Sequence, residues 1–340
     1  MKSNKIIAGV LSLCIMGTNF IGTNVNAADV VASGECGENA VWTLDSEGTF
    51  TVSGTGAMTD YRISSSSTDL EGTLTGIDWD GEAPPWFELG DQIVTLNIGE
   101  GITSVGNGCF VDCDNLTEVN LPDSLTYLGG YTFMLCDSLE EITIPDNVEK
   151  LYGFDFQNCI SLKNVVLPES LKYIGYSAFA YCKALESIVI PESTEEIYNL
   201  AFYNCYALNK MVILSKDCLI ADSESTIFQS CKLYGYKGST AETYAENYSR
   251  YFLSVLDAYD LGDVNFDGKI NAVDASLVLS QYAAIATTGE STFNILEKTV
   301  ADADGNTIIN AVDASFILGY YAYTSTGGFA DFDEYMNSQI

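Results

Sequence analysis

Two oxygen-rich segments near the C-terminus carry the side chains of this sequence that are best suited to binding a metal ion. Carboxylates and amides recur at fixed positions of each segment, and one backbone carbonyl completes each set. The first set is Asp263, Asn265, Asp267, Lys269 (through its carbonyl), Asn271 and Asp274, and the second is Asp302, Asp304, Asn306, Ile308 (through its carbonyl), Asn310 and Asp313. Ca²⁺ takes about six to eight oxygen ligands, and this spacing wraps one chain segment around one ion. The sequence therefore predicts two bound Ca²⁺ ions.

The second segment departs from the usual form of such a loop. Thr307 stands at the sixth loop position, where the sharp turn favours glycine, and Gly305 stands two positions earlier. Asn306 also replaces the acid found at the matching position of the first segment. We therefore expect the second ion to bind more weakly. The alternative for both segments is a solvated acidic loop without metal.

Helices must hold these loops in place. Each loop is followed by an apolar stretch that predicts a helix, over residues 275–283 and 314–323. The order Ala-Val-Asp-Ala-Ser, at residues 272–276 and 311–315, occurs in both halves. The segment before the first loop, residues 258–262, is short and ends in glycine, so no helix is expected there. The two halves predict a small helical module with near two-fold symmetry.

The middle of the chain is built from a repeat of 23 residues. The leucines that define it are Leu116, Leu139, Leu162, Leu185 and Leu208, and each unit also carries a Phe and a Cys three residues apart. Apolar alternation before the proline of each unit predicts one short strand, and a second extended piece follows the proline. One such unit cannot bury its own apolar side, so the units must stack into a solenoid.

The repeats resemble the BspA-like leucine-rich repeats of exported bacterial proteins, and the similarity covers residues 33–256. Residues 33–37, 41–44 and 51–56 look like the β-rich cap that opens such arrays, and residues 233–242 look like the closing segment. The resemblance implies a mainly β leucine-rich-repeat solenoid with a β-rich N-terminal cap. It also implies binding or adhesion without naming a ligand.

The duplicated loops resemble a type I-like dockerin, the calcium module that docks extracellular proteins onto cohesin domains of cellulosome scaffolds. The missing first helix, Asn at the ninth loop position and Asp at the twelfth carry this similarity. The resemblance implies a small all-α domain of two loop-helix repeats whose partner is the cohesin of a scaffoldin. It places Ala272 and Val273 of the first half, and Ala311 and Val312 of the second, against that cohesin. Because both halves share these residues, we predict two alternative docking orientations.

Six segments follow from these patterns. They are a signal peptide over 1–27, an N-terminal β-rich cap with a surface insertion over 28–100, repeats over 101–221, a C-terminal cap over 222–256, a dockerin over 257–325 and an acidic tail over 326–340. The signal has Lys2 and Lys5 ahead of an apolar run and ends in Val-Asn-Ala. It predicts a secreted protein that is extracellular, at the cell surface or attached to a cellulosome. Lipidation at Cys14 is the alternative, which the preceding Leu13 disfavours.

The composition excludes several classes of function. The chain has no histidine, which removes Ser-His-Asp and Cys-His nucleophiles and His-ligated zinc. Its 47 acids against 14 basic residues give a formal charge of −33, which disfavours nucleic acid as a partner. After the signal, no stretch reaches the ~18 apolar residues of a membrane span.

Cysteines and tyrosines are the remaining side chains with possible chemistry. Six cysteines share one repeat position, and we interpret them as small buried hydrophobes beside their phenylalanines, with disulfides between adjacent rungs as the alternative. Cys36, Cys109 and Cys218 lie outside this column and could form one bridge. The tyrosines fall at scattered repeat positions, so we interpret them as packing at the solenoid edge, with a glycan platform as the alternative.

Three functions are compatible with these observations. The favoured one is a non-catalytic, scaffold-docked protein whose repeats bind a polysaccharide or an extracellular protein. The second is a polysaccharide-degrading enzyme, since paired carboxylates perform glycoside hydrolysis without histidine. A regular solenoid with short connections offers no deep cleft, and no pair of acids stands out. The third is a structural spacer or an extracellular protease inhibitor, for which the sequence has no positive mark.

Overall fold

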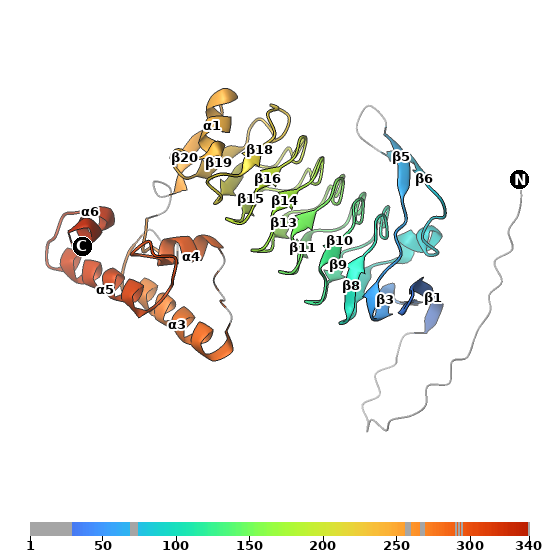
Figure 1. Cartoon of the computed structure of the whole chain (residues 1–340), viewed down its shortest axis with the longest axis horizontal. Helices are drawn as coiled ribbons and strands as arrows, with labels where there is room; N and C mark the ends of the chain where they lie inside the picture. Colours follow the sequence, from blue (N-terminus) through green and yellow to red (C-terminus); the bar gives the residue numbers. More distant parts are fainter. Residues whose placement is uncertain are drawn as a thin grey trace, which may run out of the picture.

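The computed structural model describes residues 29–68, 74–255, 260–265, 269–289, 291, 293 and 295–338. The predicted signal peptide lies outside these ranges, as does Asp267 of the first loop. A strand-rich solenoid occupies most of the described chain, and the helices α3, α5 and α6 form a group of their own (Figure 1). The predicted fold class, a leucine-rich-repeat solenoid followed by a small helical module, is confirmed.

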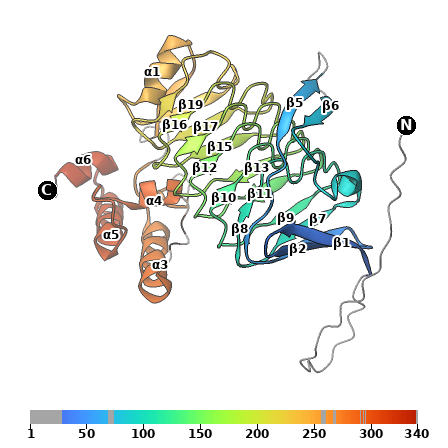
Figure 2. The ribbon, with the colours of Figure 1, turned by 45° about the vertical axis from the view of Figure 1, so that its right-hand side comes forward.

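The N-terminal region supplies three antiparallel strands and a hairpin. Strands β1 (Val30–Gly37), β2 (Ala40–Asp45) and β3 (Thr49–Gly54) pair in sequence order. Strands β5 (Ile63–Thr68) and β6 (Leu74–Trp79) form the hairpin within the predicted surface insertion, and Figure 2 shows it standing out from the first rungs. A short 3-10 helix, η1 (Phe87–Gln92), leads into the repeats.

The repeats form two rows of parallel strands, one on each side of the solenoid. The first row continues β3 with β7 (Thr95–Ile98), β9 (Glu118–Asn120), β11 (Glu141–Thr143), β13 (Asn164–Val166), β15 (Ser187–Ile190), β17 (Lys210–Ile213), β19 (Lys232–Gly235) and β20 (Phe252–Ser254). The second row contains β4 (Gly56–Ala57), β8 (Ile102–Val105), β10 (Tyr127–Leu128), β12 (Lys150–Leu151), β14 (Tyr173–Ile174), β16 (Glu196–Ile197) and β18 (Leu219–Ile220). Glu141 pairs with Asn164 and Lys150 with Tyr173, so the register equals the sequence period.

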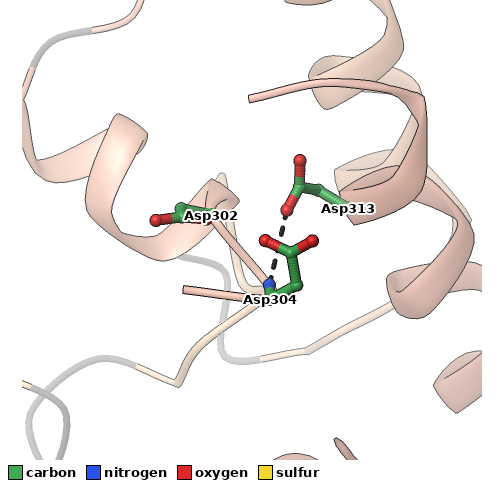
Figure 3. A group of neighbouring side chains, drawn as sticks. All are labelled: Asp302, Asp304 and Asp313. Atoms are coloured by element: carbon green, nitrogen blue, oxygen red, sulfur yellow. Dashed lines mark hydrogen bonds between the residues drawn. The ribbon is translucent and has the colours of Figure 1, made fainter. Parts of the chain in front are cut away.

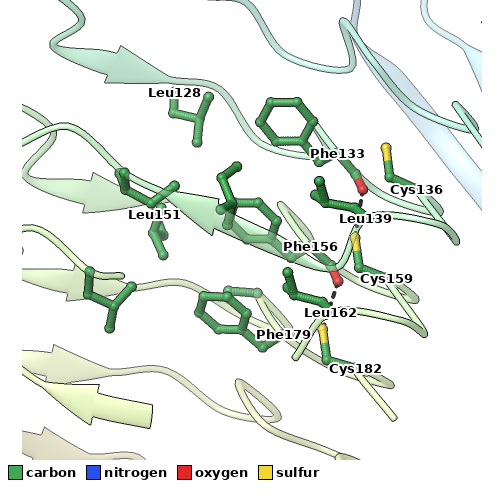
Figure 4. Packing of buried hydrophobic residues seen from close by; sticks show 14 of the residues in the cluster. Leu128, Phe133, Cys136, Leu139, Leu151, Phe156, Cys159, Leu162, Phe179 and Cys182 are labelled. Carbon is green, nitrogen blue, oxygen red and sulfur yellow. Dashed lines mark hydrogen bonds between the residues drawn. The ribbon is translucent and has the colours of Figure 1, made fainter. Parts of the chain in front are cut away.

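Between the two rows, one phenylalanine from each repeat stacks on the next. The rings of Phe156 and Phe179 lie 5.2 Å apart at 7°, and those of Phe179 and Phe202 lie 5.3 Å apart at 7° (Figure 4). Trp86 continues this column toward the N-terminus, because its ring stacks on Phe110 at 5.9 Å. The cores of the N-terminal strands and of the repeats are therefore continuous.

The cysteine column lies beside these rings. The Cys159 thiol donates to the Phe133 carbonyl at 3.0 Å, and the Cys182 thiol donates to the Phe156 carbonyl at 3.1 Å (Figure 4). The nine cysteines that the structure describes are all buried and free. Burial raises the pKa of the Cys182 thiol well above its usual value, so the column holds neutral, unreactive thiols.

Helix α1 (Thr240–Asn247) packs at the last rungs of the solenoid, within the predicted C-terminal cap. The C-terminal module contains α3 (Ala272–Thr288), α4 (Ile295–Ala301), α5 (Ala311–Ser325) and α6 (Phe332–Asn337). Helices α3 and α5 contain the two predicted helices and are longer at both ends. Helix α6 falls in the predicted acidic tail, yet its Phe332 and Met336 are buried in the core of the module. No helix within the described ranges has the length and apolarity needed to cross a membrane.

Candidate calcium loops and recognition helices

The second loop brings three carboxylates together. Oxygens of Asp302, Asp304 and Asp313 all lie within 4.8 Å of one another (Figure 3). Helix α4 ends at Ala301, directly before the first of them, and Asp313 lies in the first turn of α5. Three of the predicted ligands therefore converge between the end of one helix and the start of another.

Backbone N–H groups shape the loop around Asp302. Its two carboxylate oxygens accept from Asn306 N at 3.0 Å and from Thr307 N at 2.8 Å. Thr307 has φ +69°, the left-handed conformation that the sixth position requires, although it is β-branched. The chain thus makes the sharp turn without glycine at this position. The left-handed conformation is less favourable for threonine than for glycine, so it destabilises the loop.

The end of the loop is fixed by the helix cap of α5. Asn310 Oδ1 accepts from Val312 N at 2.7 Å, and Asp313 Oδ2 accepts from Asn310 N at 2.8 Å. The second bond belongs to a capping box, in which the Asn310 side chain in turn accepts from the Asp313 backbone N–H, and the box satisfies N–H groups at the helix start. The Asn310 amide also donates to the Ile308 carbonyl at 2.8 Å, so two predicted ligands hydrogen-bond to each other. Asp313 Oδ1 accepts from Ala303 N at 2.9 Å and holds the two ends of the loop together.

The described part of the first loop repeats this bonding 39 residues earlier. Asp274 Oδ1 accepts from Val264 N at 2.9 Å, and Asp274 Oδ2 accepts from Asn271 N at 2.8 Å. Asn271 caps α3 through Val273 N at 2.8 Å and donates to the Lys269 carbonyl at 3.2 Å. Of the other predicted ligands, Asp263 is buried and Asn265 is exposed.

The chemistry of the second loop fits a hard cation. Burial raises the pKa of Asp302 and of Asp313, and the neighbouring Asp304 charge raises both further. A cation at this point would offset both effects, and the carboxylate donors are oxygens of the kind that Ca²⁺ prefers. The residues present therefore fit the predicted ion.

Helices α3 and α5 present matching exposed residues to solvent. The predicted cohesin-facing residues Ala272, Val273, Ala311 and Val312 are all exposed at the helix starts. Sequence reasoning missed two further pairs, Leu279 with Leu318 and Tyr282 with Tyr321. The exposed fractions match across the halves: 54% and 48% for the valines, 41% and 41% for the leucines, and 45% and 43% for the tyrosines. The 39-residue offset between the helices is the signal that could have found them.

The first row of strands carries a second candidate surface. A shallow groove of about 510 Å³ runs across β9, β11 and β13. Its lining is mixed, because acidic and polar side chains alternate with apolar ones; they include Glu118, Asn120, Glu141, Thr143 and Asn164 on the polar side and Val119, Ile142 and Val166 on the apolar side.

Fold and site together define a leucine-rich-repeat solenoid joined to a duplicated calcium-loop module. Comparison with known families names both parts: residues 86–209 match the BspA type leucine rich repeat region in six copies, and residues 261–320 match the dockerin type I domain. Both are non-catalytic kinds of domain. A type I dockerin implies calcium binding and a cohesin partner, and the two domains together point to an extracellular or cell-surface protein of cellulosome type.

Solved structures of bacterial leucine-rich-repeat proteins are similar to this chain. One from Eubacterium ventriosum has 27% identity and a TM-score of 0.44, with 55% of this chain and 45% of that chain covered. The Treponema protein "T. pallidum Leucine Rich Repeat protein" has 18% identity and a TM-score of 0.38, with 62% and 94% covered. A leucine rich cell surface protein from Faecalibacterium prausnitzii has 14% identity and a TM-score of 0.26, with 66% and 95% covered. The chain thus spans less than half the length of the first of these, and no curated protein matches it.

Proposed function

We propose that this protein is an exported, non-catalytic binding protein that its dockerin attaches to a cohesin of a cellulosome-type scaffold. The observation that carries the proposal is the matched pair of helices. Asn271 and Asn310 cap them in the same way, and the exposed residues that follow agree in type and exposure 39 residues apart. A surface duplicated in this way supports recognition of one partner by either half.

In this proposal two Ca²⁺ ions set the geometry of the helices. Asp302, Asp304 and Asp313 hold the second ion, together with Asn306, Asn310 and the Ile308 carbonyl. Asp263, Asn265, Asp267, Asn271, Asp274 and the Lys269 carbonyl hold the first. Calcium supplies the positive charge that lets these carboxylates stay close together. The loops then fix where α3 and α5 begin, and with them the position of Ala272, Val273, Ala311 and Val312.

The cohesin would contact one helix start at a time. Val273 and Val312 offer equivalent apolar anchors, and Leu279 or Leu318 extends the contact along the same helix. Because the two halves are equivalent, the protein would dock in two orientations related by about half a turn. The solenoid would then carry a polysaccharide or an extracellular protein ligand on its exposed faces.

Catalysis has no support in this account. The acids that line the first-row groove lie on a shallow, open surface, and excluding water from a reaction needs a closed site. We expect no release of reducing sugar when the full chain is incubated with soluble or insoluble glycans. Release that depends on Glu118 or Glu141 would contradict the non-catalytic assignment.

Cohesin capture tests the docking proposal. The full chain is immobilised and exposed to a panel of cohesin modules, once in CaCl₂ and once in the chelator EGTA. We expect at least one cohesin to be retained in calcium and released in chelator. A variant in which Asp304 and Asp313 are replaced by Asn should capture less, and Asp217→Asn, an exposed solenoid residue, is the matched control. Capture that persists in EGTA would overturn the proposal.

A further inference from the structure

Four consecutive rungs of the second row each place one tyrosine on the outer surface. Tyr127 and Tyr173 belong to β10 and β14, whereas Tyr152 and Tyr198 directly follow β12 and β16. Residues two apart on an extended strand face the same side, so both positions contribute to one surface. At the positions of Tyr152 and Tyr198, the neighbouring rungs have Gly129 and Gly175. We call Tyr127, Tyr152, Tyr173 and Tyr198 the tyrosine row.

Ring contacts join three members of the tyrosine row, Tyr127, Tyr152 and Tyr173. The rings of Tyr127 and Tyr152 lie 5.1 Å apart. The Lys150 ammonium lies 4.6 Å from the centre of the Tyr152 ring and 5.7 Å from that of Tyr173, and so joins the two rings by cation–π contact. The row keeps solvent access, since three of the rings are half-buried and Tyr198 is 37% exposed.

Polar groups order two of these tyrosines, Tyr152 at its backbone and Tyr173 at its hydroxyl. Asp155 is fully buried, and its Oδ2 accepts from Tyr152 N at 2.7 Å. The Tyr173 hydroxyl donates to Glu195 at 2.7 Å. The buried carboxyl thus fixes the backbone of Tyr152, which lies between rungs that have Gly129 and Gly175 at this position. A preordered ring loses little freedom when a ligand stacks on it.

We propose that the tyrosine row binds an extended neutral polysaccharide by stacking sugar rings on the tyrosines. Adjacent strands lie about 4.8 Å apart, so tyrosines two rungs apart are separated by roughly 10 Å. A disaccharide of an extended β-linked chain has about the same length, which lets alternate sugars meet alternate rungs. The apolar face of a sugar packs on an aromatic ring, and its hydroxyls find the polar neighbours Lys150, Glu195 and Glu196.

The charged side chains around the tyrosine row favour a neutral polysaccharide over an anionic one. Lys172 forms an ion pair with Glu149 at 2.8 Å, so these two charges neutralise each other. The other charged side chains around the row are Glu195, Glu196 and Lys150. The chain as a whole carries a formal charge of −33, so an anionic polysaccharide would be repelled.

This inference rests on the proposed function, in which the solenoid carries a ligand. It is tested with the full chain by affinity electrophoresis in gels that contain hydroxyethylcellulose, glucomannan or polygalacturonate. We expect a neutral polymer to retard the chain and polygalacturonate to leave its mobility unchanged. The variant Tyr152→Gly/Tyr198→Gly, which adopts the residue of the neighbouring rungs, should weaken binding roughly tenfold because two stacking contacts are lost. Tyr206→Ala, an exposed tyrosine away from the row, is the matched control.

Several results would overturn the inference. These are no retardation by either neutral polymer, retardation by polygalacturonate to the same extent, or a Tyr152→Gly/Tyr198→Gly variant that binds like the parent chain. Capture of cohesin by the same variant is measured in parallel and should be unchanged. If the Tyr152→Gly/Tyr198→Gly variant loses sugar binding but still captures cohesin, the tyrosine row is supported and the docking proposal is unaffected. If the parent chain itself captures no cohesin, the docking proposal fails, whatever the result for the tyrosine row.

Discussion

Asp155 is a buried acid at a repeat position where the next two units have alanine. Ala178 and Ala201 occupy its position in the next two units, and all three are fully buried. Burial raises the pKa of Asp155 well above its usual value, because a charge in the core loses its hydration. The folded state therefore holds a proton on Asp155 at pH values where the unfolded chain has released it.

This gives a pH dependence with a defined sign. A carboxyl whose pKa is raised on folding stabilises the fold most at low pH, and that contribution is lost as pH rises through the folded-state pKa. We expect Asp155→Asn to raise the melting temperature relative to the parent chain by an amount that grows from pH 5 to pH 8. Asp217→Asn, at an exposed surface residue, is measured over the same range as the control. Parallel melting curves of Asp155→Asn and the parent chain would contradict this account.

At the scale of single residues, the sequence predicted the convergence of three acids in the second loop better than it predicted the arrangement of the tyrosine row. The loop depends on spacing within one segment, and the three acids named from that spacing do converge. The tyrosines occupy two different columns of the repeat and look scattered along the 23-residue period. Only strand geometry, which turns residues two apart to one side, brings Tyr127 and Tyr152 together.

Among the structural elements, the phenylalanine column forms a buried stack that runs through the solenoid. Phe156 is fully buried and stacks on Phe133 at 5.7 Å and on Phe179 at 5.2 Å. We expect Phe156→Ala to lower the free energy of unfolding by about 3–5 kcal/mol, since it removes a ring and leaves a cavity. Urea denaturation followed by far-UV circular dichroism measures this loss. Phe329→Ala, at a residue that is 98% exposed, should change it by less than about 0.5 kcal/mol.

The strands of the repeats and the helices α3 and α5 followed from sequence patterns, but two other elements did not. The β5–β6 hairpin lies in a segment rich in Ser, Thr, Asp and Gly that has no strand pattern of its own, and it is held where Ile63 and Ile77 pack on Val111. Helix α6 is short and acidic, and it is held because Phe332 and Tyr335 pack on Tyr320. Tertiary contacts of this kind leave no local signal in the sequence.

For the whole molecule, we expect removal of calcium to affect the C-terminal module and not the solenoid. The carboxylates of Asp302, Asp304 and Asp313 repel one another without a cation, whereas the solenoid core contains no part of either loop. At a calcium concentration about 100 times the dissociation constant, the ion adds about 2.7 kcal/mol of stability. Differential scanning calorimetry in CaCl₂ and in EGTA should therefore show one transition shifted down by roughly 10 °C. An unchanged profile would argue against metal binding.

The central claim is that two equivalent helix starts dock the protein onto one cohesin. Isothermal titration calorimetry of the full chain with a captured cohesin, in calcium, tests it most directly. One variant replaces Ala272 and Val273 with Asp, a second replaces Ala311 and Val312, and a third combines all four changes; Asp is tolerated in the first turn of a helix. The account predicts about a twofold loss of affinity for each of the first two variants and a loss of more than about 100-fold for the third. Abolition of binding by either of the first two variants alone would contradict it.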